Sequence, residues 1–398
     1  MKDPLGDAAP VETRKAVSGI LVIVASLVLL VALRPSLLVT VAIIVGLVVT
    51  IMLHEWGHYY AAKKAGMKVT EFFLGFGPRI WSFRRGETEY GIKAIPAGGY
   101  VRIIGMTNLE AVDPADEART YRQSTTPKKL TVVLAGIAVN LVLVLVLTYT
   151  ILVVRGRESL STQVDRVTAG SPARAAGIRA DDRIVSIDGT PVGDWETLSE
   201  LVRPNAGTAL TVVVLRDGRE VPISVTPEMV EGAGRIGVTS RIVSDPESPI
   251  TALPKSFAVL VEGTKQVAEV LGRIFSPSGL ERYGKTVTNT KGGFTGQERP
   301  RSVIGIVAEG DDIVRGDFVV LLGLLASINL FLALFNALPL PPLDGGHAAI
   351  ACYEGIASKV TRRRVRVDYR RVMPVAAIVM MFLLMFGLSA MYLDIRGL

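Results

Sequence analysis

Uncharged apolar runs long enough to cross a membrane constrain this chain more than any other feature. There are five: Val17–Leu33, Leu37–Leu53, Leu130–Val154, Phe318–Leu343 and Met373–Leu393. A helix of about 20 apolar residues spans a hydrocarbon core of about 30 Å. The last three runs reach that length, and the second reaches it if its helix continues through Tyr59–Ala62. We therefore expect a polytopic α-helical membrane protein with about five transmembrane helices.

The first apolar run also has the length of a cleaved signal peptide. The stretch before Arg34 lacks an A-x-A cleavage pattern, and a second apolar run follows at once. Pro35 suits the first turn of that second helix. We expect a retained transmembrane hairpin.

The charged residues predict the orientation of these helices. Lys63–Lys129 holds 12 basic and 7 acidic residues, and Glu354–Arg371 holds 7 and 2, whereas Arg155–Asp317 holds 20 and 22. Because positive connections stay on the cytoplasmic side, the long near-neutral segment is expected outside the cell membrane. The net charge of +7 thus follows topology, and no nucleic-acid partner is expected. With Cys352 as its only cysteine, the chain has no intramolecular disulfide.

The extracytoplasmic segment begins with short β-branched runs separated by turn signals. We expect strands at Gln163–Val167, Asp182–Ile187, Leu210–Leu215 and Glu220–Val225, and a helix over Trp195–Val202 capped by Asp194. The stretch SPARAAGIRADDRIVSIDG with the elements after it resembles a PDZ domain of the circularly permuted bacterial type. That resemblance implies strand-like binding of peptide ends. A plain β-domain that screens large proteins from the membrane fits the residues equally well. An amphipathic helix is expected over Ser256–Phe275, and a loop over Ser276–Ser302.

The chemistry is indicated first by His54-Glu55-Trp56-Gly57-His58, at the cytoplasmic end of the second apolar run. Histidines four residues apart lie on one helix face and can reach one metal ion. The glutamate beside the first histidine can act as general base on a water that the metal activates. Ionisable residues at such a depth are usually functional.

A second polar cluster ends the fourth apolar run. The sequence from Asn336 to His347 reads NALPLPPLDGGH, and its prolines stop the helix. Two histidines leave a zinc ion one ligand short, and both Asp344 and His347 could supply it. Ligand chemistry alone does not choose between them.

HEWGH in an early helix, a PDZ-like domain and NALPLPPLDGGH near the C-terminus together resemble a bacterial site-2 protease. The members of this family are intramembrane zinc metalloproteases of regulated intramembrane proteolysis. The resemblance implies that one Zn2+ is held by His54, His58 and Asp344, that Glu55 is catalytic and that Asn336 binds substrate. His347 then has a supporting role.

Glycines mark the segment between the second and third helices. Residues Glu89–Ile104 alternate and then turn through Pro96-Ala97-Gly98-Gly99, as in a hairpin. This is similar to the family's re-entrant β-hairpin, which dips toward the active site and pairs with an unwound substrate strand. Gly98 and Gly99 would permit close backbone approach there. A surface hairpin with no substrate role is the alternative.

The resemblance implies substrates that are single-span membrane proteins already trimmed by another protease, such as anti-sigma factors. Remnant signal peptides are a second substrate class, and peptide ends would bind the PDZ-like domain. The competing interpretation is a non-catalytic membrane scaffold built on that domain. Glu55 between the two histidines favours the protease.

The expected order of segments follows from these patterns. It runs through a cytoplasmic N-terminus (1–16), a transmembrane hairpin with HExxH (17–62), a cytoplasmic segment with the β-loop (63–129), a transmembrane helix (130–154), the PDZ-like domain (155–230), an extracytoplasmic amphipathic helix and loop (231–317), a transmembrane helix with the LDGG motif (318–346), a basic cytoplasmic segment (347–371) and a C-terminal transmembrane helix (372–398).

Overall fold

The computed structural model describes residues 37–230, 232–288 and 317–397, with isolated residues and short stretches between 25 and 34 and between 291 and 314. The chain divides into two compact units. One comprises Met1–Thr150 with Leu253–Leu398, and the other comprises Ile151–Ala252. The predicted N-terminal segment 1–16 and most of the predicted helix Val17–Leu33 lie outside the described residues.

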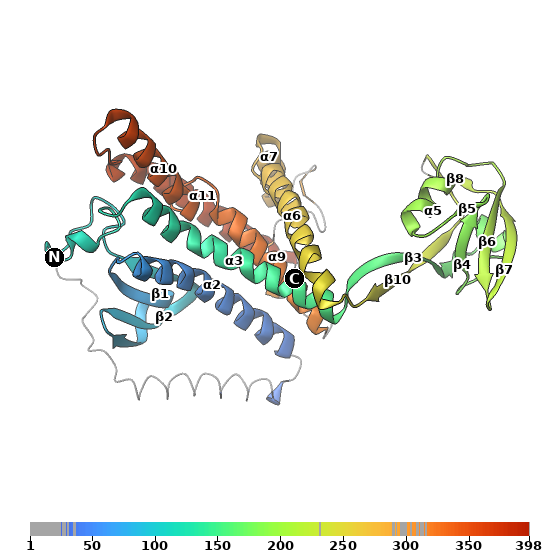
Figure 1. The fold of residues 1–398 in the computed structure, drawn as a ribbon, viewed down its shortest axis with the longest axis horizontal. Coiled ribbons are helices and arrows are strands. Elements are labelled where there is room, and N and C mark those ends of the chain that lie inside the picture. Colours follow the sequence, from blue (N-terminus) through green and yellow to red (C-terminus); the bar gives the residue numbers. More distant parts are fainter. Residues whose placement is uncertain are drawn as a thin grey trace. The chain divides into compact units, whose positions relative to one another are not determined.

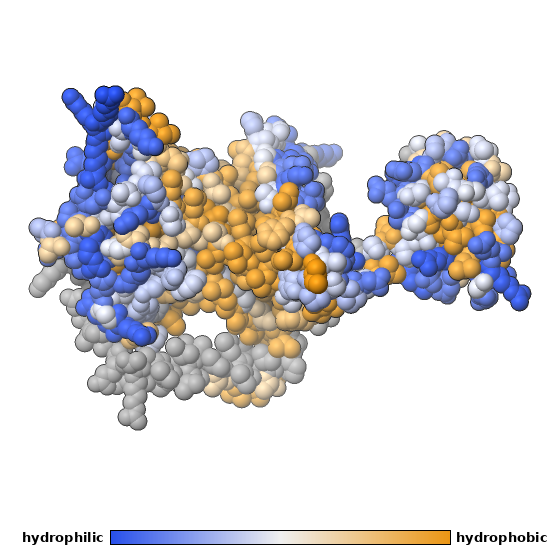
Figure 2. Space-filling view, in the orientation of Figure 1, coloured by the Kyte–Doolittle hydropathy of each residue, from blue (hydrophilic) through white to orange (hydrophobic). Residues whose placement is uncertain are grey.

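Within the described residues, the first unit contains four helices that are long and apolar enough to cross a membrane. They are α2 (Leu38–Lys64), α3 (Thr126–Val154), α9 (Phe318–Asn336) and α11 (Tyr369–Gly397). Figure 1 shows them in the ribbon, and Figure 2 shows apolar residues over the helices and hydrophilic residues gathered at the end that carries strands β1 (Val69–Arg85) and β2 (Thr88–Ile103). The chain is a polytopic membrane protein with mixed helix and sheet.

The fourth predicted transmembrane segment is shorter than expected. Helix α9 ends at Asn336, and a new helix, α10 (Asp344–Thr361), starts eight residues later. The prolines between them lack the amide protons that would continue the helix, so a loop carries the chain from one helix to the other. Helix α10 therefore runs across the predicted division between residues 346 and 347.

Strands β1 (Val69–Arg85) and β2 (Thr88–Ile103) pack against α2. The predicted pairing within Glu89–Ile104 was wrong. Residues 71–74 of β1 lie between two parts of β2, residues 89–92 on one side and 99–102 on the other. The first part of β2 also pairs with residues 81–85 of β1 on its other side, and in these pairings the two parts of β2 are not partners of each other.

The second unit is built on one antiparallel sheet with the strand order β10-β3-β4-β6-β7, and β5 pairs with β4. Its elements are β3 (Arg157–Val167), α4 (Pro172–Ala176), β4 (Arg183–Ile187), β5 (Thr190–Pro191), α5 (Trp195–Val202), β6 (Leu210–Arg216), β7 (Arg219–Val225), β8 (Glu228–Val230), β9 (Ala233–Arg235) and β10 (Val238–Asp245). The four predicted strands and the helix capped by Asp194 are confirmed. The sheet extends past the predicted boundary at 230, because β10 pairs with β3.

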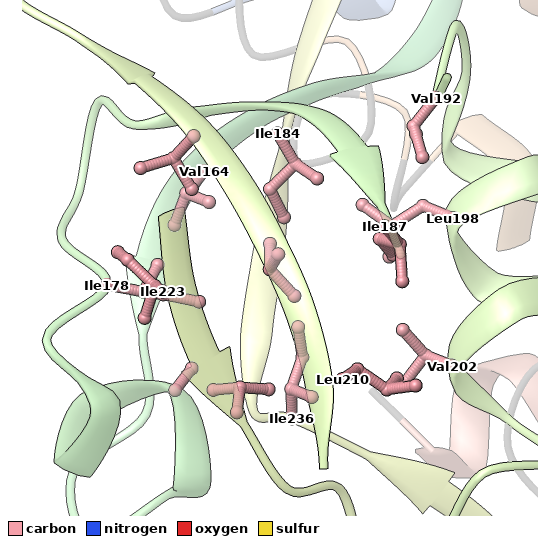
Figure 3. Close-up of a cluster of buried hydrophobic side chains, with 14 residues drawn as sticks. Val164, Ile178, Ile184, Ile187, Val192, Leu198, Val202, Leu210, Ile223 and Ile236 are labelled. Carbon is pink, nitrogen blue, oxygen red and sulfur yellow. The ribbon is translucent and has the colours of Figure 1, made fainter. Parts of the chain in front are cut away.

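A branched-aliphatic core holds the sheet and α5 together. Figure 3 shows side chains from β3, β4, β6 and α5 meeting in one cluster that includes Val164, Ile184 and Leu198. At its border Asp182 is 1% exposed, and its carboxylate accepts hydrogen bonds from Arg216 Nε (2.7 Å), Arg216 Nη2 (2.6 Å) and the Arg179 amide (2.8 Å). Burial opposes the charge, but these donors prevail and lower the pKa of Asp182.

Asp182→Ala should destabilise this sheet by about 3 kcal/mol, since it leaves Arg216 without its buried partner. Because the pKa is lowered on folding, the stabilisation is full above the ordinary carboxyl pKa and is lost as pH falls below it. Hydrogen exchange of the β4 and β6 amides in the full-length chain measures the effect. Asp165→Ala removes a more exposed ion pair, in which Asp165 Oδ1 lies 3.9 Å from Arg241 Nε, and should change hydrogen exchange little. Equal exchange in the two variants would contradict the assignment.

Between the sheet and residue 288, where the chain is described without a gap, the segment forms helices α6 (Pro249–Ile274) and α7 (Pro277–Val287). Helix α6 confirms the predicted amphipathic helix. The predicted loop over Ser276–Ser302 was wrong in its first part, where α7 forms. Its start has the usual signals, because the Ser276 side chain accepts a hydrogen bond from the Gly279 amide and Pro277 occupies the first turn.

Candidate metal centre

Helix α2 carries the first two candidate ligands. His54 and His58 lie one turn apart and are 6% and 7% exposed. Their Nε2 atoms approach to 3.2 Å. His58 Nδ1 lies 2.8 Å from the carbonyl oxygen of Val132 on α3, so the protonated Nδ1 donates there and the Nε2 lone pair faces His54.

Asp344 comes to the same point from the far end of the sequence. Its Oδ2 lies 3.2 Å from His54 Nε2 and 3.2 Å from His58 Nε2. The two glycines after it make this placement possible, because the loop from α9 folds back onto the start of α10. A Cβ on Gly345 would lie 2.3 Å from the Ala337 oxygen, and one on Gly346 would lie 2.5 Å from Pro341 N.

The three facing atoms suit a tetrahedral zinc ion. Ligand atoms about 2.1 Å from such an ion lie about 3.4 Å apart, close to the three observed separations. Two imidazole nitrogens and a carboxylate are ligands that zinc accepts. Asp344 Oδ2 is buried and lacks a hydrogen-bond partner within the described part of the chain, as expected for an atom that needs a cation. The residues present therefore fit the metal.

Glu55 lies beside this cluster, on the side where β2 passes. A Cβ on Gly99 would lie 3.2 Å from Glu55 Cγ, so the absence of a side chain lets the strand approach the glutamate. The Glu55 carboxylate also faces the backbone of Val101. Gly98 has φ 135°, and a Cβ there would lie 3.0 Å from the ring of Phe76. Of the two glycines, only Gly99 touches the glutamate.

Asn336 is the last residue of α9 and is half-buried. Helices α2 and α9 run parallel where they touch, because a Cβ on Gly46 would meet Leu325 and Asn329 Nδ2 bonds Thr50 Oγ1 at 3.0 Å. The same offset aligns Asn336 with Gly57, which lies between His54 and His58 on α2. Asn336 thus lies near the level of the cluster.

His347 lies apart from the three-residue cluster. Its Nδ1 is 3.4 Å from the Tyr369 hydroxyl, and its ring stacks on that tyrosine. It lines a small separate pocket together with Lys129 and Glu354. The geometry therefore places Asp344, rather than His347, against the histidine pair.

Two residues of α3 near the site were missed by the sequence interpretation. A Cβ on Gly136 would lie 2.4 Å from His58 Nε2 and 2.8 Å from His54 Cε1, so only glycine admits both rings. Asn140, one turn further along the same helix, is fully buried. The available signal was a glycine and an asparagine four residues apart inside an otherwise apolar run, since small residues mark close helix contacts in membranes.

Two histidines, an aspartate and a neighbouring glutamate among membrane-crossing helices are the residues of a membrane-embedded zinc metalloprotease. Comparison with known proteins gives the family: the model of Peptidase family M50 matches residues 42–385, and the chain belongs to this family of site-2 proteases. The protein is accordingly a zinc metalloprotease, with zinc as its cofactor.

Several curated proteins resemble the chain over most of its length. It is 33% identical over 390 residues to the zinc metalloprotease Rip1 of Mycobacterium tuberculosis, a match that covers 88% of this chain and 95% of that protein. It is 34% identical over 377 residues to Rip1 of Mycolicibacterium smegmatis, covering 84% and 91%. It is 28% identical over 363 residues to the metalloprotease MmpA of Caulobacter vibrioides, covering 82% and 88%.

Proposed function

We propose that this protease hydrolyses peptide bonds within the transmembrane segments of single-span membrane proteins, as in regulated intramembrane proteolysis. The observation that supports this most is the position of the histidine and aspartate cluster, which is buried among helices apolar enough to cross a membrane. A hydrolase with such surroundings is suited to a substrate that arrives through the lipid.

In the proposed mechanism, His54, His58 and Asp344 hold the zinc ion. A zinc ion held there would polarise the scissile carbonyl and would make water acidic enough to lose a proton near neutral pH. Glu55 accepts that proton and later passes it to the leaving amine. The absence of a side chain on Gly99 leaves room for the glutamate side chain beside the cluster.

The substrate must unwind first, because helical carbonyls are occupied by internal hydrogen bonds. We propose that Asn336 holds the unwound segment and that β2 pairs with it. Residues 99–103 pair with β1 along one side. In the described pairings their other side is an edge of the sheet, where a substrate strand could be added. Gly98 and Gly99 would then allow the two backbones to approach closely.

We further propose that the second unit (Ile151–Ala252), here called the sheet unit, lies outside the cell. The metal centre would lie near the cytoplasmic side of the cell membrane, as the distribution of basic residues favours. A PDZ-like sheet unit in that position would exclude substrates that still carry bulky ectodomains. The substrates would be proteins already trimmed by another protease, such as anti-sigma factors.

Removing the sheet unit tests this filter. Excision of residues 157–245 with a short flexible replacement should allow cleavage of single-span substrates whose ectodomains are intact. A pre-trimmed substrate should be cut at a similar rate by both forms, which controls for damage to the metal centre. If the shortened protein still rejects intact substrates, the filter is wrong.

The proposed reaction is tested with the purified protein and a single-span substrate in lipid. Mass spectrometry of the fragments should place the cut inside the apolar segment of the substrate, and helix-weakening residues near that position should increase the rate. A zinc chelator should stop the reaction, and added zinc should restore it. Cuts confined to the segments outside the membrane would contradict the proposal.

A further inference from the structure

Asn140 of α3 is the least explained polar residue in the helical unit. It is 0% exposed, and neither its Oδ1 nor its Nδ2 has a hydrogen-bond partner among the residues that the structure describes. A buried amide without partners costs about 1–3 kcal/mol. Its neighbours in the buried stripe of α3, such as Ile137 and Val144, are apolar. The buried amide of Asn140 therefore requires a polar group nearby as its hydrogen-bond partner.

The packing of α2 on α3 locates Asn140 next to His54. The two helices run antiparallel, because His58 contacts Val132 whereas Gly136, one turn further along α3, touches both His58 and His54. Asn140 follows Gly136 by four residues, so it lies on the same face about 6 Å further along. Along α2 the same direction runs from His58 to His54, so Asn140 lies beside His54.

The hydrogen-bonding needs of the neighbours match what Asn140 offers. A histidine that binds metal through Nε2 normally donates its Nδ1 proton to an acceptor, which fixes the ring. His58 has such an acceptor in Val132, but His54 Nδ1 is buried and has none within the described chain. On α9, Asn329 donates to Thr50 and Leu325, and its Oδ1 is likewise unpartnered in the described residues.

We propose that Asn140 is the positioning residue for His54. One buried water accepts a hydrogen bond from His54 Nδ1–H and donates one to Asn140 Oδ1, and Asn140 Nδ2 donates toward Asn329 Oδ1. Buried waters of this kind bridge groups that would otherwise remain unsatisfied. The network ties the first ligand to α3 and α9, and through Asn329 to Thr50 one turn before it on α2. The inference rests on the proposed role of His54 as a zinc ligand.

The test measures zinc affinity of the full-length protein by competition with a chelator, beside the spectrum of the cobalt-substituted form. Asn140→Leu keeps the branched shape of the side chain and removes both polar atoms, so zinc affinity should fall about 10- to 100-fold and the cobalt spectrum should change. Asn140→Asp keeps the acceptor and should remain within a few-fold of the native affinity. Thr148→Val, a change at a buried polar residue two turns further along α3, is the matched control and should have no effect.

Thermal unfolding of the metal-free variants separates positioning from misfolding, since a loss of zinc affinity in a protein with native metal-free stability is not a folding defect. If Asn140→Leu does not fold, Asn140→Ala takes its place and should lose about tenfold in affinity. Native zinc affinity and an unchanged cobalt spectrum in a folded Leu or Ala variant would overturn the inference. Asp344→Ala distinguishes this failure from failure of the site itself, because retained zinc there would refute the ligand assignment.

Discussion

Glu55→Gln should leave the zinc ion bound and reduce cleavage by about 10²- to 10⁴-fold or more. The amide has the shape of the carboxylate, so the contact with Gly99 and the positions of His54 and His58 are kept. It cannot accept the proton that the reaction must remove, and general base catalysis is worth about that much. The measurement is the cleavage rate of a single-span substrate in lipid, with zinc content determined on the same sample.

A second glutamate offers the control for this change. Glu117 accepts hydrogen bonds from Arg122, which help to lower the pKa of Glu117 to about 2, and it lies outside the membrane-crossing helices. Glu117→Gln makes the same chemical change away from the metal and should keep the native rate. A Glu55→Gln protein that cleaves as fast as Glu117→Gln would show that another group accepts the proton.

Features that depend on local sequence could be predicted well. Helix Trp195–Val202 begins where predicted because the Asp194 side chain accepts from the Thr197 amide. The turn between β6 and β7 could be predicted because Asp217 and Gly218 both take positive φ, at 50° and 77°. In each case the residues that decide the structure are neighbours in the chain.

Features that depend on distant contacts could not be derived from spacing. The approach of Asp344 to His54 and His58 was expected from the family resemblance alone, since composition left His347 equally possible. The position of residues 71–74 of β1 between two parts of β2 has no local signal in the sequence. Alternation of apolar and polar residues gives the face on which a side chain lies and not its partner strand. Gly136 likewise looks like any glycine in an apolar helix until the position of α2 is known.

Gly136→Ala should weaken zinc binding by about 100-fold, the upper end of losses caused by displaced ligands. The added methyl carbon would lie 2.4 Å from His58 Nε2 and 2.8 Å from His54 Cε1, closer than real contacts allow. His58 is held by Val132, so relief requires the helices or the rings to shift. Zinc sites tolerate errors of only about 0.2 Å in ligand distance. Chelator competition measures the loss, and cleavage should fall with it.

Helix propensity makes this prediction specific to the site. Alanine is favoured over glycine within helices by about 1 kcal/mol, so the metal-free Gly136→Ala protein should remain folded. Gly323→Ala in α9 is the matched change, because a Cβ there meets nothing within 4 Å, and it should bind zinc normally. The two variants add the same carbon to a membrane-crossing helix, so a difference in zinc affinity comes from the contact with the histidines. Equal affinity would mean that the rings do not need the space that Gly136 provides.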